Sequence, residues 1–324
     1  MRFLTLLKVN YKMKQYTDIE DICNPSELIN EAISLKANPF AFEDLGKHKT
    51  LVMLFFNSSL RTRLSTEKAA KNLGMQVMVL NLSDAWNLEF EDGTVMSLES
   101  PEHVKEAAQV ISQYGDMIAI RAFPTLTDKV KDESEQILSS FAKYASVPVV
   151  NMESATAHPM QALADAITIE ELKAEGKKPK VVLSWAPHVK ALPQAVANSF
   201  IKMMQTIDAD LTITHPEGYE LNPDITKATP INYNQTEAFK DADFVYVKNW
   251  SNYKDYGKVT NTDASWMITK EKLGQAKFMH CLPVRRNVVV EDAVLDSDQS
   301  IVIEEANNRT FAAQIVMKKI LENL

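Results

Sequence analysis

Short apolar runs alternate with longer amphipathic stretches along most of the chain. This alternation is typical of α/β proteins, in which helices connect the strands of a parallel sheet. We therefore predict two α/β domains, each a mostly parallel sheet flanked by helices. The predicted strands span residues 50–56, 76–82, 116–123, 147–152, 180–186, 210–215, 243–250, 277–282 and 300–306.

Helical patterns fill the segments between these strands, for example over residues 59–74 and 100–115. A long helical pattern begins shortly after residue 155, and we place the domain boundary there. The first domain is expected over residues 1–155 and the second over residues 156–310. Apolar residues at helical spacing predict a C-terminal helix over residues 311–324 that packs back on the first domain.

The 324-residue chain has a formal net charge of −8, which argues against nucleic acid as a partner because phosphate backbones bind basic surfaces. No apolar run is long enough to span a membrane. The two cysteines are far apart and no metal-ligand motif occurs, so we expect a cytoplasmic protein without a disulfide framework, metal or cofactor. Residues 1–12 lack the cleavage site of a secretory signal, and Met13 offers an alternative start.

The segment FFNSSLRTRLS, residues 55–65, places hydroxyl and guanidinium groups at a predicted strand-to-helix turn. A helix N-terminus presents unpaired N–H groups and attracts anions. Ser59 is expected to cap this helix, and Arg61, Thr62 and Arg63 add donors that suit phosphate oxygens. Two solvated surface arginines are the alternative, but the neighbouring hydroxyls favour a phosphate site. The segment is not a Walker loop because it lacks GxxxxGK.

Other candidate side chains stand near the ends of predicted strands, where ligands bind in parallel α/β sheets. Arg121 ends an apolar run, and its burial there would require an anionic partner, although snorkelling to solvent is an equal alternative. In HPMQ, Pro159 suits a first helical turn, which places His158 at the N-cap and Gln161 one turn inside. Both side chains could polarise a carbonyl oxygen, and Glu153 on the same loop could bind an amine.

The segment MHCLPVRRN, residues 279–287, follows another predicted strand. Cys281 would need an activating base to act as a nucleophile. Its neighbour His280 cannot supply one, because adjacent side chains in a strand point to opposite faces. We therefore do not predict a cysteine hydrolase, and we expect backbone carbonyls of this turn to accept amide hydrogens.

Taken in this order, SLRTR, the strand-end Arg121, HPMQ and HCLP resemble the carbamoyl-phosphate site of the aspartate and ornithine transcarbamylase family. The resemblance covers the chain from about residue 13 to the C-terminal helix. It implies carbamoyl transfer without a covalent intermediate, with carbamoyl phosphate on the first domain and the acceptor on the second. The implied catalytic residues are Arg61, Arg121, His158, Gln161, Cys281 and Arg309. The implied carbamoyl-phosphate contacts are these six together with Ser59, Leu60, Thr62, Trp86 and Leu282.

Trp86 resembles an aromatic residue that, in part of this family, reaches the active site of a neighbouring subunit, which implies a homotrimer with shared sites. The Ser-Met-Gly loop of ordinary ornithine enzymes is absent, and HCLPVRRN resembles the enzymes of arginine biosynthesis that carbamoylate N-acylornithine. That subgroup also implies a chain knot in the second domain. The implied acceptor contacts are Glu153, Trp185, Lys248, Cys281, Leu282, Arg286 and Pro101.

The acyl group is expected to depend on Pro101, which stands where acetyl-preferring enzymes carry a glutamate before a Glu-His pair. The absence of that carboxylate favours a negatively charged succinyl tail, because like charges repel. We therefore predict N-succinylornithine as the acceptor, with N-acetylornithine as the alternative. A catalytically inactive carbamoyl-phosphate-binding protein is a further alternative. A nicotinamide dehydrogenase is disfavoured because GxGxxG is absent.

Overall fold

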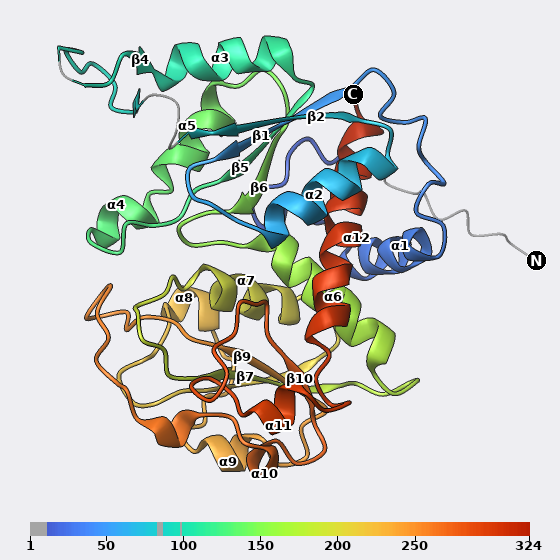
Figure 1. Ribbon diagram of the computed structural model, residues 1–324, viewed down its shortest axis with the longest axis vertical. Coiled ribbons are helices and arrows are strands. Elements are labelled where there is room, and N and C mark those ends of the chain that lie inside the picture. Colours follow the sequence, from blue (N-terminus) through green and yellow to red (C-terminus); the bar gives the residue numbers. More distant parts are fainter. Residues whose placement is uncertain (1–11, 83–86, 98) are drawn as a thin grey trace, which may run out of the picture.

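The computed structural model describes residues 12–82, 87–97 and 99–324. It contains two four-stranded sheets, both parallel throughout, one above the other in Figure 1. The first has the order β2-β1-β5-β6 and the second the order β10-β9-β7-β8. The strands of the first sheet are β1 (Thr50–Phe55), β2 (Gln76–Asn81), β5 (Met117–Arg121) and β6 (Val149–Glu153). Those of the second are β7 (Lys180–Trp185), β8 (Asp210–Thr214), β9 (Phe244–Lys248) and β10 (Lys277–Met279).

Helices cover both faces of each sheet, as the alternation of apolar runs and helical patterns predicts. Among the described residues, no helix combines the length and the apolar content needed to cross a membrane. The longer helices are α1 (Pro25–Ala37), α2 (Arg61–Asn72), α3 (Val104–Tyr114), α5 (Gln136–Tyr144), α6 (Pro159–Leu172), α7 (Ala195–Met204) and α12 (Val302–Leu321). Shorter elements are η1 (Ile19–Asp21), β3 (Leu88–Glu89), β4 (Glu102–His103), α4 (Lys129–Glu133), α8 (Pro223–Thr226), α9 (Gln235–Ala238), η3 (Ala264–Trp266), α10 (Lys270–Leu273) and α11 (Asp292–Leu295).

Alternating side chains of β1 enter different cores, because successive residues of a strand point to opposite faces. Val52 and Leu54 pack with residues of α3 and α5. Leu51 and Met53 belong to a larger core that includes residues of α1, α2 and α12. Both faces of the strand are therefore buried, which explains its continuous apolar run.

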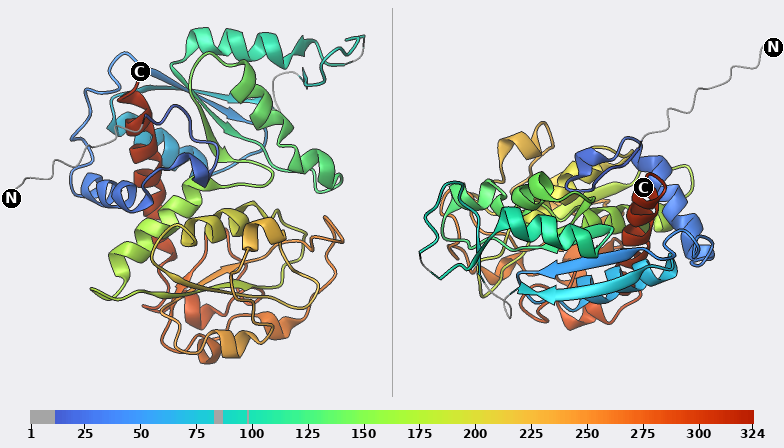
Figure 2. Two further views of the ribbon diagram at one scale, coloured as in Figure 1. Left: turned by 180° about the vertical axis from the view of Figure 1, so that it is seen from behind. Right: turned by 90° about the horizontal axis from the view of Figure 1, so that it is seen from above.

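Helices α6 and α12 join the two halves of the molecule. They pack against each other, and α12 also packs against α1 and α2 on the first sheet and against β10 in the second. Figures 1 and 2 show α12 running from the second sheet to the first, where the chain ends. From Pro159 to Ile169 every residue of α6 is buried, so this helix is enclosed on all sides.

Eight of the nine predicted strands coincide with β1, β2 and β5 to β10, but the ninth, residues 300–306, is wrong. Only Ser300 bridges β10, opposite Phe278, and α12 begins at Val302. The short apolar run in this segment resembles the pattern of a strand. In the structure, however, the buried positions from Val302 onward recur at helical spacing. The consequence is that Glu305 lies inside a buried helix.

Each sheet has a topological switch point, where the connections from two neighbouring strands lead in opposite directions. In the first sheet it lies between β1 and β5, and in the second between β7 and β9. Arg121 is the last residue of β5 and Lys248 the last of β9. Ligands in such folds bind beyond the carboxyl ends of strands at these points.

Candidate functional site

A cavity of about 450 Å³ lies at the carboxyl ends of both sheets. First-domain elements supply the segment before α2, the start of α2 and the ends of β5 and β6, while loops after β7 and β10 and the end of β9 come from the second. The cavity is lined by Ser58, Ser59, Leu60, Arg61, Thr62, Arg121, Phe123, Glu153, His158, His188, Leu192, Pro193, Val196, Lys248, Cys281, Leu282, Pro283, Arg285 and Arg309.

The N-terminus of α2 opens into this cavity with Arg61 and Thr62. No side chain caps the helix, so the predicted capping role of Ser59 is wrong. Ser59 nevertheless lines the cavity, whereas Arg63 is exposed and lines a different one. An uncapped N-terminus is suited to an anion, because its N–H groups and the helix dipole both favour negative charge.

Thr62 joins two buried guanidinium groups that come from distant parts of the chain. Its Oγ1 accepts from Arg121 Nη1 at 3.0 Å and from Arg309 Nη2 at 2.7 Å. A hydroxyl oxygen has two lone pairs, so these bonds leave the Thr62 proton free to donate. Arg121 Nε and Arg309 Nε make no hydrogen bond within the described part of the chain. The cluster therefore retains donors for an anionic ligand.

Glu153 supplies a carboxylate to this cationic cavity. It forms a buried ion pair with Arg121, and its Oε2 lies 3.2 Å from His158 Nε2. Burial raises the pKa of Glu153, although Arg121, Arg309 and Lys248 oppose that change. The predicted need of Arg121 for an anionic partner is met by this residue.

His158 is the N-cap of α6, and Pro159 occupies the first turn as predicted. Burial lowers the pKa of His158 well below its usual range, and Arg309 and Arg121 lower it further. The imidazole is therefore neutral at physiological pH and carries one N–H. Its Nε2 lies beside Glu153, and Nδ1 makes no hydrogen bond with described residues.

Gln161 was predicted to face the cavity. It lies behind the residues that line the cavity and does not face it. Its Nε2 donates to Asp165 Oδ1 at 2.7 Å and to Glu305 Oε1 at 3.1 Å, while its Oε1 accepts from Arg309 Nη1. The carboxamide is fully engaged within the protein. It holds Arg309 in place, and so acts on the cavity through that side chain.

The turn after β10 contributes Cys281 and Leu282. The strand ends at Met279, and the Leu282 N–H donates to His280 Nδ1 at 2.9 Å. Burial lowers the pKa of His280 well below its usual range, so this nitrogen remains an acceptor. His280 thus stabilises the turn and does not line the cavity beside Cys281.

Lys248, His188 and Arg285 line the second-domain side of the cavity. Arg285 Nε donates to His188 Nε2 at 3.1 Å, which fixes these two side chains relative to each other. Among the lining residues that the structure describes, five are cationic and one, Glu153, is a carboxylate. This local excess contrasts with the net charge of −8 for the whole chain. A highly charged anion is the ligand that such a cavity fits.

Three of the predicted acceptor contacts do not line this cavity. Trp185 is fully buried, and its indole N–H donates to the Trp250 carbonyl at 3.0 Å. Arg286 is exposed and forms ion pairs with Asp292 and Asp296, whereas its neighbour Arg285 lines the cavity. The sequence could not distinguish these two arginines, because neighbouring residues in the turn after a strand point in different directions.

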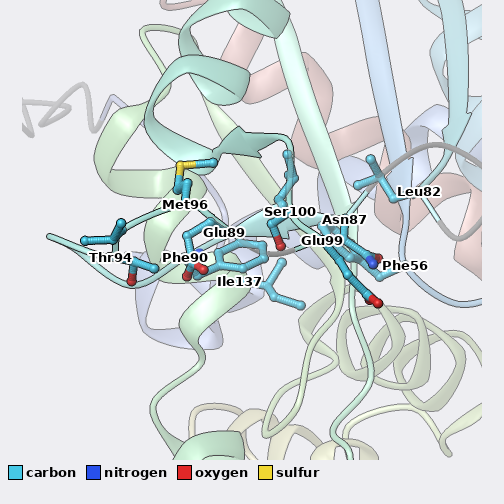
Figure 3. Close-up of a pocket in the computed structure, with 12 residues that line it drawn as sticks. Phe56, Leu82, Asn87, Glu89, Phe90, Thr94, Met96, Glu99, Ser100 and Ile137 are labelled. Carbon is cyan, nitrogen blue, oxygen red and sulfur yellow. Dashed lines mark hydrogen bonds between the residues drawn. The ribbon is translucent and has the colours of Figure 1, made fainter.

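Pro101 is exposed and directly precedes β4, away from the cationic cavity of its own chain. The neighbouring residues Glu99 and Ser100 line a larger cavity of about 690 Å³, shown in Figure 3. Its described lining includes the apolar Phe56, Phe90 and Ile137 but no cation, so it does not suit a phosphate. The predicted contact Trp86 lies outside the described residues.

Several lining residues were missed by sequence reasoning. His188 and Leu192 belong to the loop after β7, which was predicted to contact the acceptor but from which only Trp185 was named. The location of this loop at the second switch point is the signal that points to them. Phe123 was also missed, and its ring lies under the guanidinium of Arg121, 4.3 Å from the ring centre.

Two family models match the chain: "Aspartate/ornithine carbamoyltransferase, carbamoyl-P binding domain" over residues 14–171 and "Aspartate/ornithine carbamoyltransferase, Asp/Orn binding domain" over residues 192–320. The chain belongs to the aspartate/ornithine carbamoyltransferase family. The lining residues from Ser58 to His158 lie within the first match. Those from Leu192 to Arg309 lie within the second, and His188 lies shortly before it.

Relatives in this family differ in the acceptor that their names state. N-Succinylornithine carbamoyltransferase from Bacteroides thetaiotaomicron is 48% identical, covering 96% of this chain and all of its own. N-Acetylornithine carbamoyltransferase from Xanthomonas campestris is 36% identical, covering 91% of this chain and 93% of its own.

Solved structures show the same fold. Acetylornithine transcarbamylase complexed with acetylcitrulline has a TM-score of 0.89 and 34% identity, covering 95% of this chain and 99% of its own. A variant of N-acetyl-L-ornithine transcarbamylase with one glutamate replaced by alanine, complexed with carbamyl phosphate and N-succinyl-L-norvaline, has the same TM-score, identity and coverages.

Proposed function

We propose that this protein transfers the carbamoyl group of carbamoyl phosphate to the δ-amine of N-succinyl-L-ornithine, yielding N-succinyl-L-citrulline and phosphate. The observation that carries the proposal is the meeting of Arg61, Arg121 and Arg309 with the uncapped start of α2 in one cavity. The 48% identity to a relative with this named activity supports the choice of acceptor.

The phosphate end of the donor is assigned to the first-domain side of the cavity. The N–H groups of α2 bind it together with Thr62 and the three guanidinium groups, which stabilise charge on the departing phosphate. Burial lowers the pKa of Arg61, and repulsion from the nearby charges of Arg309 and Arg121 lowers it further. A dianionic ligand relieves that repulsion.

The carbamoyl group is assigned to the space between His158 and the turn that carries Cys281 and Leu282. The neutral imidazole of His158 carries one N–H, which we assign to the oxyanion that develops as the uncharged δ-amine attacks. The backbone carbonyls of the turn accept the carbamoyl amide hydrogens. Catalysis then consists of positioning and charge stabilisation, without a covalent intermediate.

The acceptor is assigned to the second-domain side, where Lys248, His188 and Arg285 face the cavity. These groups suit the carboxylates of an acylated amino acid.

Replacing Lys248 with methionine, which keeps the approximate length of the side chain but removes the ammonium, is expected to raise KM for the acceptor roughly ten- to a hundredfold. KM for carbamoyl phosphate is expected to change by less than about threefold, since the phosphate donors remain. Steady-state kinetics with each substrate varied in turn will measure both values. A selective rise in KM for carbamoyl phosphate would contradict the assignment.

The acyl preference is tested by phosphate release with ornithine, N-acetylornithine, N-succinylornithine and aspartate. We expect the succinyl compound to have the highest kcat/KM, by at least about tenfold, because Pro101 stands where acetyl-preferring enzymes carry a carboxylate that would repel its tail. Pro101→Glu is expected to reverse the order in favour of the acetyl compound. A wild-type preference for acetylornithine would exclude the charge argument.

The position of Pro101 outside its own chain's cavity bears on assembly. If residues near Pro101 select the acyl group, they must reach the site of another subunit, so we propose a homotrimer with shared sites.

The alternative function is that of a catalytically inactive carbamoyl-phosphate-binding protein. Such a protein would bind phosphate in calorimetry but release no phosphate with any of the four acceptors.

A further inference from the structure

Two carboxyl groups are buried together behind the cationic cavity. Asp165 lies on α6 and Glu305 on α12, and neither side chain is exposed to solvent. Neither lines the cavity, and the proposed reaction assigns them no role. Burying two acidic groups side by side is costly, so their contacts indicate what they stabilise.

The first contact determines the orientation of a carboxamide. Gln161 Nε2 donates to Asp165 Oδ1 at 2.7 Å and to Glu305 Oε1 at 3.1 Å. With its nitrogen held by two carboxyl oxygens, Gln161 must present its oxygen on the other side, where it accepts from Arg309 Nη1. The pair thereby selects the amide orientation that an arginine can use.

The second contact reaches the opposite wall of the cavity. Glu305 Oε2 accepts from the His280 backbone N–H at 2.9 Å. His280 Nδ1 in turn accepts from the N–H of Leu282, so the turn around Cys281 is connected to Glu305. One side chain on α12 is thus linked both to the guanidinium of Arg309 and to the Cys281 turn.

Burial raises the pKa of Asp165 to about 7 and that of Glu305 well above its usual range, with the nearby Asp165 as a further cause for Glu305. A proton held by the pair near neutrality lowers the cost of burying the two groups together. Both oxygens of Glu305 accept N–H donors, whereas Asp165 Oδ2 has no hydrogen-bond partner among the described residues.

We propose that the Asp165–Glu305 pair is a positioning element. It fixes the position of the phosphate-binding Arg309 relative to the Cys281 turn on the opposite side of the cavity. Neither carboxyl group touches the ligand; both act through Gln161 and the backbone of His280. The inference rests on the proposed carbamoyl-phosphate site. It predicts different consequences for two substitutions that each exchange one carboxyl for a carboxamide.

Glu305→Gln leaves a single acceptor oxygen for two N–H donors, so one of the two links must break. We expect KM for carbamoyl phosphate and Kd for inorganic phosphate to rise at least about tenfold, while KM for the acceptor rises less than about threefold. Asp165→Asn keeps the bond that the proposal uses, because its carboxamide oxygen can accept from Gln161 Nε2 as the carboxyl oxygen does. That conservative variant is expected to remain within about threefold of the wild type in all three values. Glu304→Gln, on the exposed face of the same helix, is the matched control.

The melting temperature of each variant is measured as well. This measurement distinguishes a loss of positioning from a loss of folding, since a purely structural defect lowers stability without selectively weakening phosphate binding. Native phosphate affinity in a folded Glu305→Gln protein would overturn the proposal, and so would equal losses in Asp165→Asn and Glu305→Gln. Calorimetry with inorganic phosphate does not depend on turnover. If the wild type transfers no carbamoyl group, the proposed function fails, and the phosphate titration still tests the positioning of Arg309.

Discussion

Replacing Arg61 with alanine is expected to lower kcat/KM for carbamoyl phosphate by about a thousandfold or more. The residue begins α2 and lines the cavity near two other guanidinium groups, which the proposal assigns to the same phosphate. Charge-assisted bonds to a phosphate in such a site strengthen as the leaving group gains charge, so their loss affects the transition state most. Phosphate-release kinetics and calorimetric titration with inorganic phosphate measure the loss.

Arg63→Ala provides the matched control for this experiment. Arg63 lies two residues further along the same helix, is exposed, and lines a different cavity. Its replacement is expected to change kcat/KM by less than about twofold, as for most surface substitutions. Near-normal turnover and phosphate affinity in the Arg61 variant would refute the assignment of the phosphate site.

Replacing Glu153 with glutamine is expected to destabilise the protein and to lower kcat by at least about a hundredfold. Glu153 is the partner of buried Arg121 and the carboxylate that offsets the other cations of the cavity. Removing one partner of a buried pair typically costs about 3–5 kcal/mol, so the melting temperature should fall by roughly 5 °C or more in phosphate-free buffer. His158 Nε2 lies 3.2 Å from the Glu153 carboxylate, so the substitution also changes the surroundings of the proposed oxyanion donor.

Added phosphate gives this prediction a second measurement. Because the Glu153 variant has an uncompensated cluster of cations, inorganic phosphate should raise its melting temperature more than that of the wild type. Glu67→Gln, at a helix-surface pair with Lys71, removes the same charge and should show neither effect. An unchanged melting temperature without phosphate would mean that Arg121 does not depend on Glu153.

The strand-end positions illustrate how far sequence reasoning reaches in this fold. Arg121 ends an apolar run, and the carboxyl ends of parallel strands are where ligands bind, so its place in the cavity follows from local pattern and topology. Lys248 ends a strand of the other sheet and was predicted only through the family resemblance. The phosphate character of the segment around Arg61 followed from the chemistry of a helix N-terminus. The capping role of Ser59 did not hold, because backbone conformation at a turn is not determined by residue type alone.

The wrong predictions concern segments whose local sequence fits more than one structure equally well. The apolar residues after Ser300 fit a strand or a buried helix, and only packing of α12 between the two sheets resolves the choice. Arg285 and Arg286 are adjacent and chemically alike, yet one lines the cavity and the other pairs with Asp292 and Asp296. Periodicity cannot assign such neighbours within an irregular turn.

By itself the sequence determined the alternation of strands and helices, the absence of a Walker loop, and the four motifs that indicate carbamoyl phosphate. Only the tertiary structure decided that Gln161 faces a buried carboxyl pair instead of the cavity, and that Thr62 joins Arg121 to Arg309. The physical reason is that local pattern depends on neighbours in sequence, whereas these contacts join residues far apart in the chain. Their geometry follows from how the two sheets and α12 pack together.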